Sequence, residues 1–86
     1  MSTKTLRSCE HRNFTATDTA LKDVNLVGIF VASASTGTLK LADATGTIVN
    51  TFSVAAATWY EIPARISGQL TITVGGTLDA TAFYAQ

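Results

Sequence analysis

Apolar and polar residues alternate with a period of two over most of the chain after residue 24. In residues 68–75, the leucine, isoleucine and valine side chains would face one way and the threonines between them the other. This alternation is typical of a β-strand that is buried on one face only. Turn residues recur at short intervals, and helical periodicity is absent. The pattern predicts about seven short strands and an all-β fold, a small antiparallel β-sandwich or jelly-roll-like barrel with an N-terminal arm.

The expected strands of this part cover residues 24–33, 38–42, 47–54, 58–66, 69–74 and 78–85. Asp43-Ala-Thr-Gly46 is a turn sequence, so residues 38–54 are predicted to form a hairpin. Asn50 interrupts the inward apolar positions of this hairpin, which a β-bulge or a hydrogen-bonded edge position would explain. Pro63 cannot donate a hydrogen bond to a neighbouring strand, so its strand is expected to lie at an edge or to break there. Gly75-Gly76 is expected to form a further turn.

The segment 24–33 is apolar on both faces. Simple alternation places Leu26 and Phe30 on one face. The other face would carry Val27, Ile29 and Val31. A strand with two apolar faces is typical of the centre of a sheet, or of a strand that a neighbouring subunit covers. We therefore expect Val27, Ile29 and Val31 to face outward and to contact another subunit.

The length of 86 residues leaves room for one folded domain. Residues 1–23 are expected to form a polar, charged N-terminal arm or edge strands, and residues 24–86 the β-sandwich domain. The first segment holds more than half of the charged side chains, namely Lys4, Arg7, Glu10, Arg12, Asp18, Lys22 and Asp23. Such a segment either reaches a neighbouring subunit and adds a strand to its sheet, or is a partly disordered terminus. Leu6, Arg7 and Arg12 are the expected contacts of an arm.

Charged residues make up 14% of the chain, against about 25% in an average globular protein. The surface is therefore rich in threonine, serine and alanine, which suits either a soluble monomer or a subunit that its partners cover. The formal net charge of zero excludes the strongly basic surface of a typical nucleic-acid-binding protein. Neither an apolar signal segment nor a membrane-spanning run is apparent, so we expect a soluble protein without a membrane partner.

Few residues capable of chemistry are present. The one cysteine, Cys9, excludes an intrachain disulfide and a cysteine-rich zinc site, and it fits synthesis in a reducing cytoplasm. His11 is the one histidine, and nothing in the sequence places it beside a serine and an aspartate as a catalytic triad requires. Glu61 and Arg65 are expected to form an exposed ion pair or to face cross-strand partners. We therefore expect no enzyme activity, no cofactor and no metal site.

Trp59 is the most distinctive candidate for binding. Alternation places Tyr60 inward and Trp59 outward, on the strand that contains Pro63. An outward tryptophan either caps one end of the sandwich, contacts a partner protein or stacks on a carbohydrate. No further aromatic residue is expected on the same face, which favours a protein contact over carbohydrate binding.

Four stretches of the sequence carry a resemblance to a known group of proteins. They are Val27-Gly-Ile-Phe-Val-Ala-Ser-Ala-Ser-Thr-Gly-Thr-Leu-Lys-Leu, Asn50-Thr-Phe, Trp59-Tyr-Glu-Ile-Pro-Ala and Gly68-Gln-Leu-Thr-Ile-Thr-Val-Gly-Gly-Thr-Leu-Asp-Ala-Thr-Ala-Phe-Tyr. Over residues 24–85 the chain resembles small proteins that tailed bacteriophages encode among their virion structural genes. The resemblance implies a β-structured virion protein, above all a capsid decoration (cement) protein that binds the outside of the head at capsomer junctions.

The resemblance also implies partners and a location. A decoration protein of this kind binds the major capsid protein or another virion protein and forms homo-oligomers, often trimers. It joins the virion during assembly in the host cytoplasm and holds the capsid against internal pressure. The alternative within the same group is a head-fibre, tail or adsorption module that recognises a host glycan through Trp59. In either case modest contacts of one subunit add up over many copies.

Overall fold

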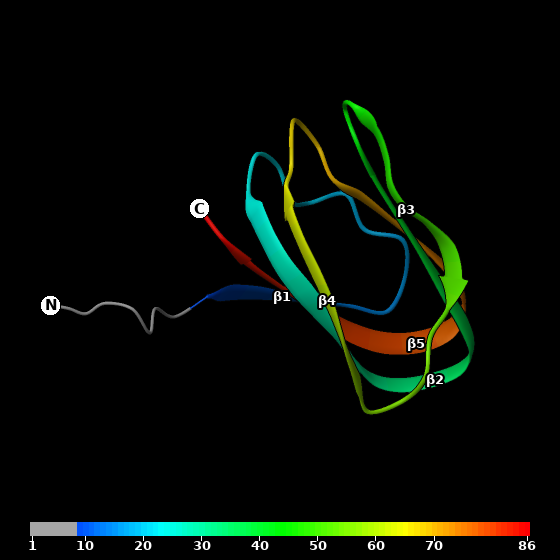
Figure 1. Cartoon of the computed structure of the whole chain (residues 1–86). Helices are drawn as coiled ribbons and strands as arrows, with labels where there is room; N and C mark the ends of the chain where they lie inside the picture. Colours follow the sequence, from blue (N-terminus) through cyan, green and yellow to red (C-terminus); the bar gives the residue numbers. More distant parts are fainter. Residues whose placement is uncertain (1–8) are drawn as a thin grey trace, which may run out of the picture.

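A computed structural model describes residues 9–86, which form an antiparallel β-structure without a helix in that range (Figure 1). The strands are β1 (Glu10–Phe14), β2 (Asn25–Asp43), β3 (Gly46–Ser53), β4 (Thr58–Arg65) and β5 (Thr71–Ala85). The all-β prediction is therefore confirmed.

The five strands form a single open sheet with β2 at its centre. On one side β2 pairs with β5 over almost its whole length, and β1 pairs with the far edge of β5. On the other side β4 covers the first half of β2 and β3 covers the second half. This pairing establishes an antiparallel open sheet. It does not by itself establish the sandwich or jelly-roll-like barrel that the strand pattern suggested.

The two longest strands continue through positions where the sequence predicted breaks. β2 runs on through the small residues before residue 38, and β5 runs on through Gly75-Gly76. The two irregular positions lie side by side, since Ser35 pairs with Thr77 and the register shifts beyond that pair. Thr36 and Gly76 both have left-handed backbone conformations, with φ of 58° and 70°. β2 and β5 therefore bend together instead of turning, and Figure 1 shows their common curvature.

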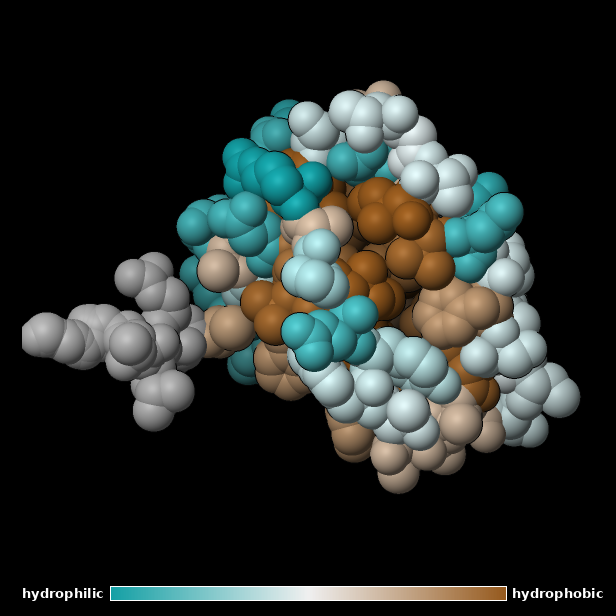
Figure 2. Space-filling view, in the orientation of Figure 1, coloured by the Kyte–Doolittle hydropathy of each residue, from teal (hydrophilic) through white to brown (hydrophobic). Residues whose placement is uncertain are grey.

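The hydrophobic core lies on the inner face of this bent sheet. Its fully buried large side chains are Val24, Ile29, Val31, Leu39, Leu41, Ile66, Leu70 and Ile72. β3 and β4 do not pair with each other, and their inward side chains Phe52 and Tyr60 meet edge to face with ring centroids 5.4 Å apart. Both side chains are only half-buried. Figure 2 shows apolar residues in a hollow at the centre of one face, with more polar residues around it.

The hairpin of β2 and β3 confirms the predicted turn at residues 43–46, where Gly46 has a φ of 131°. The register shifts beside Asn50, because Leu39 faces Phe52 whereas Leu41 faces Val49. This irregularity is the β-bulge that the sequence suggested, and it leaves Asn50 exposed. β4 pairs only with β2, so Pro63 lies on an edge strand as predicted.

The described part of the N-terminal segment belongs to the sheet. β1 pairs with the second half of β5, and the chain that follows forms isolated bridges from Asp18 to Ile72 at the start of β5 and from Lys22 to Gln69 just before β5. Phe14 and Leu21 are buried in the core. Within this segment, Glu10–Phe14 form a strand at the edge of the sheet. Residues 1–8, with the predicted arm contacts Leu6 and Arg7, lie outside the described residues.

Candidate interaction site

Aromatic side chains gather on the outer face of the sheet, where β4, β2 and β5 lie next to one another. Phe30 of β2 pairs with Trp59 of β4, and the neighbouring Gly28 pairs with Phe83 of β5. Among residues 9–86, Trp59 and Phe30 are the large apolar side chains that remain exposed, by 42% and 39%. Together with Cys9, Val27 and Phe83, they line an open groove of about 430 Å³. We call this surface the apolar groove.

Gly28 allows the Trp59 ring to lie close against β2. A Cβ atom at Gly28 would lie 2.5 Å from Cζ2 and 2.6 Å from Cη2 of Trp59. The absence of a side chain there lets the indole cross the strand and reach Phe83, at a centroid distance of 5.9 Å and an interplanar angle of 60°. His11 of β1 lies next in this row, with its ring centroid 6.3 Å from that of Phe83. Tilted aromatic contacts of this kind hold the rings in fixed orientations.

The orientation of Trp59 was predicted correctly, but its surroundings were not. Trp59 faces outward and Tyr60 inward, as alternation requires. The expectation that no other aromatic residue shares this face is wrong, because Phe30 and Phe83 line the same groove. Their positions depend on the pairing of β2 with β4 and β5, which brings together residues far apart in the sequence. Gly28 was the available signal, since a glycine within a strand often marks a close approach or a bulge.

The predicted outward face of β2 needs a correction. The register shifts between Leu26 and Gly28 in the pairings with both β4 and β5. This bulge reverses the faces of the residues from Gly28 to Val31 relative to simple alternation. Ile29 and Val31 are therefore completely buried, and neither can contact another subunit. Val27 alone of the predicted three lies on the outer face, in the apolar groove.

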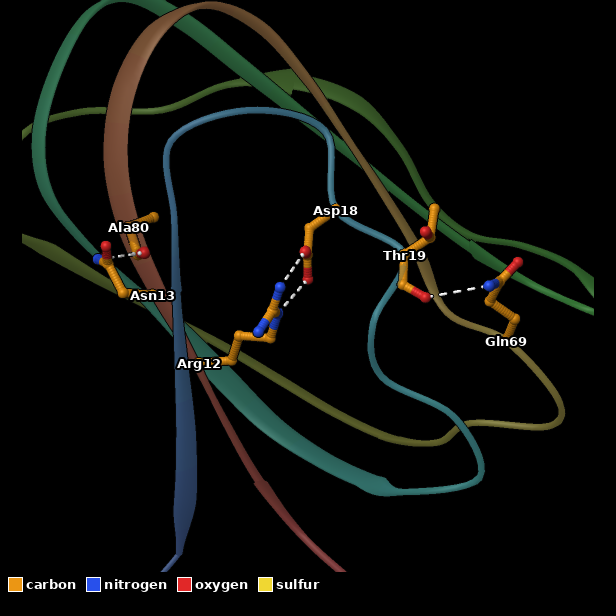
Figure 3. A network of polar contacts seen from close by, with 6 residues as sticks. All are labelled: Arg12, Asn13, Asp18, Thr19, Gln69 and Ala80. Carbon is orange, nitrogen blue, oxygen red and sulfur yellow. Dashed lines mark hydrogen bonds and ion pairs between the residues drawn. The ribbon is translucent and has the colours of Figure 1, made fainter.

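Arg12, the third predicted arm contact, forms an ion pair within the chain (Figure 3). Its Nε and Nη2 atoms donate hydrogen bonds to the two carboxylate oxygens of Asp18, each at 2.9 Å. The hydrogen bond and the charge of Asp18 raise the pKa of Arg12. The pair closes the loop between β1 and the segment that runs along β5. A contact of Arg12 with another subunit stays a prediction, since the side chain is still 44% exposed.

Further polar contacts in the same region fasten the N-terminal segment to β5 (Figure 3). Asn13 Nδ2 donates to the backbone oxygen of Ala80 at 2.9 Å and to Asp79 Oδ1 at 2.8 Å. Gln69 Nε2 donates to the backbone oxygen of Thr19 at 3.0 Å. These contacts are structural. Those of Asn13 lie on β1, the edge strand that also places His11 beside Phe83.

The described residues hold no arrangement of side chains suited to metal binding. No group of three histidine, cysteine, aspartate or glutamate side chains in residues 9–86 could hold a metal ion together. In the same range the ion pair is that of Arg12 with Asp18, so of the two alternatives expected for Glu61 and Arg65 the ion pair is not formed. The residues opposite them on β2 are Gly28 and Asn25. Arg65 instead donates a long hydrogen bond, 3.4 Å, to the backbone oxygen of Asp23.

Two carboxylates bind the backbone between β4 and β5. Asp43 Oδ2 accepts a hydrogen bond from the Ser67 amide at 2.8 Å, and its Oδ1 accepts from the Thr45 amide at 2.9 Å. Asp23 Oδ1 accepts from the Gly68 amide at 2.8 Å. The hydrogen bond from Ser67, followed by those from Thr45, holds the pKa of Asp43 below its ordinary value. Both aspartates therefore act as structural links between turns.

Asp43→Asn is expected to lower the melting temperature at neutral pH and to weaken its dependence on acid. Because the pKa of Asp43 is lower in the folded state, its contribution is complete above the unfolded-state value of about 4 and is lost as the pH falls through the folded value. The asparagine keeps one acceptor, but its amide group would face the Ser67 N–H. Thermal unfolding of both proteins at neutral pH and between about pH 2 and 4 measures the effect. Identical pH profiles would contradict it.

The apolar groove is thus the feature of this chain best suited to binding. No helix long and apolar enough to cross a membrane occurs in the part of the chain that the structure describes. Comparison with protein-family models, with curated proteins and with solved structures gave no match.

Proposed function

We propose that this chain is a non-enzymatic structural protein of a bacteriophage virion, and that it binds the outside of the head as a capsid decoration protein. The observation that supports a binding role most directly is the apolar groove around Trp59. Aromatic side chains are enriched at the energetically dominant positions of protein interfaces, and the groove has no charged side chain in its lining. The virion assignment itself rests on the resemblance of residues 24–85.

The proposed mechanism is repeated weak binding. Each subunit offers a small apolar contact, and many subunits on one shell convert modest affinities into stable attachment. The partners are the major capsid protein or another virion protein, together with further copies of this chain in a homo-oligomer, for which a trimer is favoured. The proposal includes a β-sandwich, in which the two halves of the bent sheet would be the two layers.

The copy number of the chain in purified particles tests this function. Quantitative mass spectrometry of particles of the virus that encodes the chain measures it against the major capsid protein. We expect hundreds of copies per particle, because decoration proteins cover the whole shell. A handful of copies would overturn decoration and indicate a vertex, tail or fibre. Complete absence from the particles would overturn the virion proposal.

Trp59→Ala is expected to weaken binding of the purified chain to its particle by about 30-fold or more, as truncation of a dominant interface residue does. Binding is measured by co-sedimentation with particles from which the chain has been removed. Thr73→Ala is the matched control, since Thr73 is exposed on β5 but does not line the groove. Equal binding of the two variants would show that the groove takes no part in attachment.

A glycan-binding adsorption module is the second candidate. The observation that favours it is the presence of Phe30 and Phe83 beside Trp59, since sugar rings stack on aromatic side chains. The lining offers no polar side chain to bind sugar hydroxyl groups, which is why protein contact is preferred. Binding to a host glycan array that Trp59→Ala abolishes, together with a low copy number, would support this candidate.

A further inference from the structure

The apolar groove lies where residues 1–8 join the described part of the chain. Cys9 is the first described residue, and it also lines the groove. The apolar side chains of residues 1–8 are those of Met1 and Leu6. Eight extended residues span at most about 26–29 Å, enough to bridge two neighbouring subunits that lie side by side.

The charges of the two parts of the chain are opposite. Residues 1–8 contain Lys4 and Arg7 and no acidic side chain, whereas residues 9–86 contain four basic and six acidic side chains. One of the exposed acids, Glu61, lies on the same face of the sheet as the groove. Glu10 follows Cys9 in the chain, but it pairs with Tyr84, which packs against the core, so its side chain lies on the other face. Glu61 pairs with Gly28, against which the Trp59 ring lies. A basic segment with one apolar anchor therefore complements the groove in both polarity and charge.

We infer that the apolar groove binds residues 1–8 of a second copy of this chain. Leu6 of that copy packs against Trp59 and Phe30, while Lys4 and Arg7 lie near Glu61 at the rim. This inference rests on the proposed role of the groove as a protein contact, and it names the partner. The groove then becomes the self-association surface of a homo-oligomer.

The local geometry favours residues 1–8 of a second copy as the occupant of the groove over the chain's own residues 1–8. β1 runs antiparallel to the last residues of β5, with Glu10 opposite Tyr84, so the chain enters the sheet at its end. To reach its own groove, the segment before Cys9 would have to reverse direction within a few residues. Of the residues that favour tight turns, residues 1–8 contain serine at positions 2 and 8, but no glycine, proline, asparagine or aspartate. An extended path to a neighbour requires no such reversal.

Trp59 provides the test, because it is the one tryptophan of the chain and lies in the groove. Acrylamide quenching of its fluorescence is measured on the full chain from nanomolar to near-millimolar concentration, alongside the molecular mass by sedimentation equilibrium. We expect quenching to fall as the concentration rises, in step with the increase in mass. If Trp59 were protected from quenching equally at all concentrations, the chain's own residues 1–8 would fill the groove. That result would overturn the inference.

Two variants with the same change of charge separate the apolar contact from the electrostatic one. Leu6→Asp is expected to lose the concentration-dependent protection of Trp59 and the increase in mass. Thr3→Asp lies in the same segment but removes no large apolar side chain, and it should retain most of both effects. Association of Leu6→Asp that equals that of the unchanged protein would overturn the inference. Neither measurement uses particles, so failure of the virion proposal would be seen separately in the copy number.

Discussion

Replacement of Ile29 by alanine is expected to lower the free energy of unfolding by about 2–5 kcal/mol. Ile29 has no exposed surface and lies in the middle of the sheet, paired with Tyr60 of β4 and Ala82 of β5. Truncation removes buried apolar surface and leaves a cavity that the neighbouring strands cannot fill. The loss is a large share of the roughly 5–15 kcal/mol that stabilises a typical domain. Urea denaturation followed by circular dichroism measures it.

Val27→Ala is the matched control for this prediction. Val27 is also a β-branched residue of β2, but the bulge places it in the apolar groove, where it is only half-buried. Its truncation is expected to cost less than about 1 kcal/mol. A larger loss for Val27 than for Ile29 would mean that the register shift between Leu26 and Gly28 is absent in solution.

The Ile29 result bears on how far the sequence predicts this fold. The all-β class, the hairpin at residues 38–54 and the edge position of Pro63 all follow from local patterns, because alternation and turn residues act over a few positions. Which side chains of β2 face the core does not follow from local patterns. One inserted residue near Gly28 exchanges the two faces of a strand that is apolar on both sides, and its composition is compatible with either choice.

The long strands show a second limit. A glycine pair such as Gly75-Gly76 permits a left-handed backbone conformation, but it does not say whether the chain turns back or merely bends. The outcome depends on the partner strand. Because β2 and β5 pair on both sides of the irregular positions, each continues as one strand. Pairing over such long sequence separations leaves no local signal.

The residues of the candidate site, like those of the fold, could be predicted only where the signal is local. Trp59 was identified from alternation along its own strand, which is local information. Phe30 and Phe83 lie beside Trp59 only because β2 pairs with both β4 and β5. Simple alternation placed Phe30 on the wrong face, since it does not include the bulge that buries Ile29. Alternation therefore placed Trp59 and Val27 correctly on the outer face, and the pairing of the strands supplied Phe30 and Phe83.

Gly76→Ala is expected to be the second strongly destabilising substitution. Gly76 has a φ of 70°, in a region that costs a residue with a side chain about 1–2 kcal/mol. A Cβ atom there would also collide with the Thr36 carbonyl group, lying 2.8 Å from its carbon. Since the obstacle is backbone, the facing strand has to shift, which adds about 1–3 kcal/mol. Urea denaturation should therefore show a loss of roughly 2–5 kcal/mol from the two effects combined.

Thr36→Gly tests the same bend from the opposite strand. Thr36 is a β-branched residue with a φ of 58°, a conformation that such residues rarely adopt. Glycine relieves this strain but raises the entropy of the unfolded chain by an equivalent of about 0.4–1 kcal/mol, so the substitution should be neutral or slightly stabilising. If both substitutions destabilised the protein equally, backbone conformation would not be the cause. Opposite effects would show that the bend of β2 and β5 is held by two left-handed residues in contact.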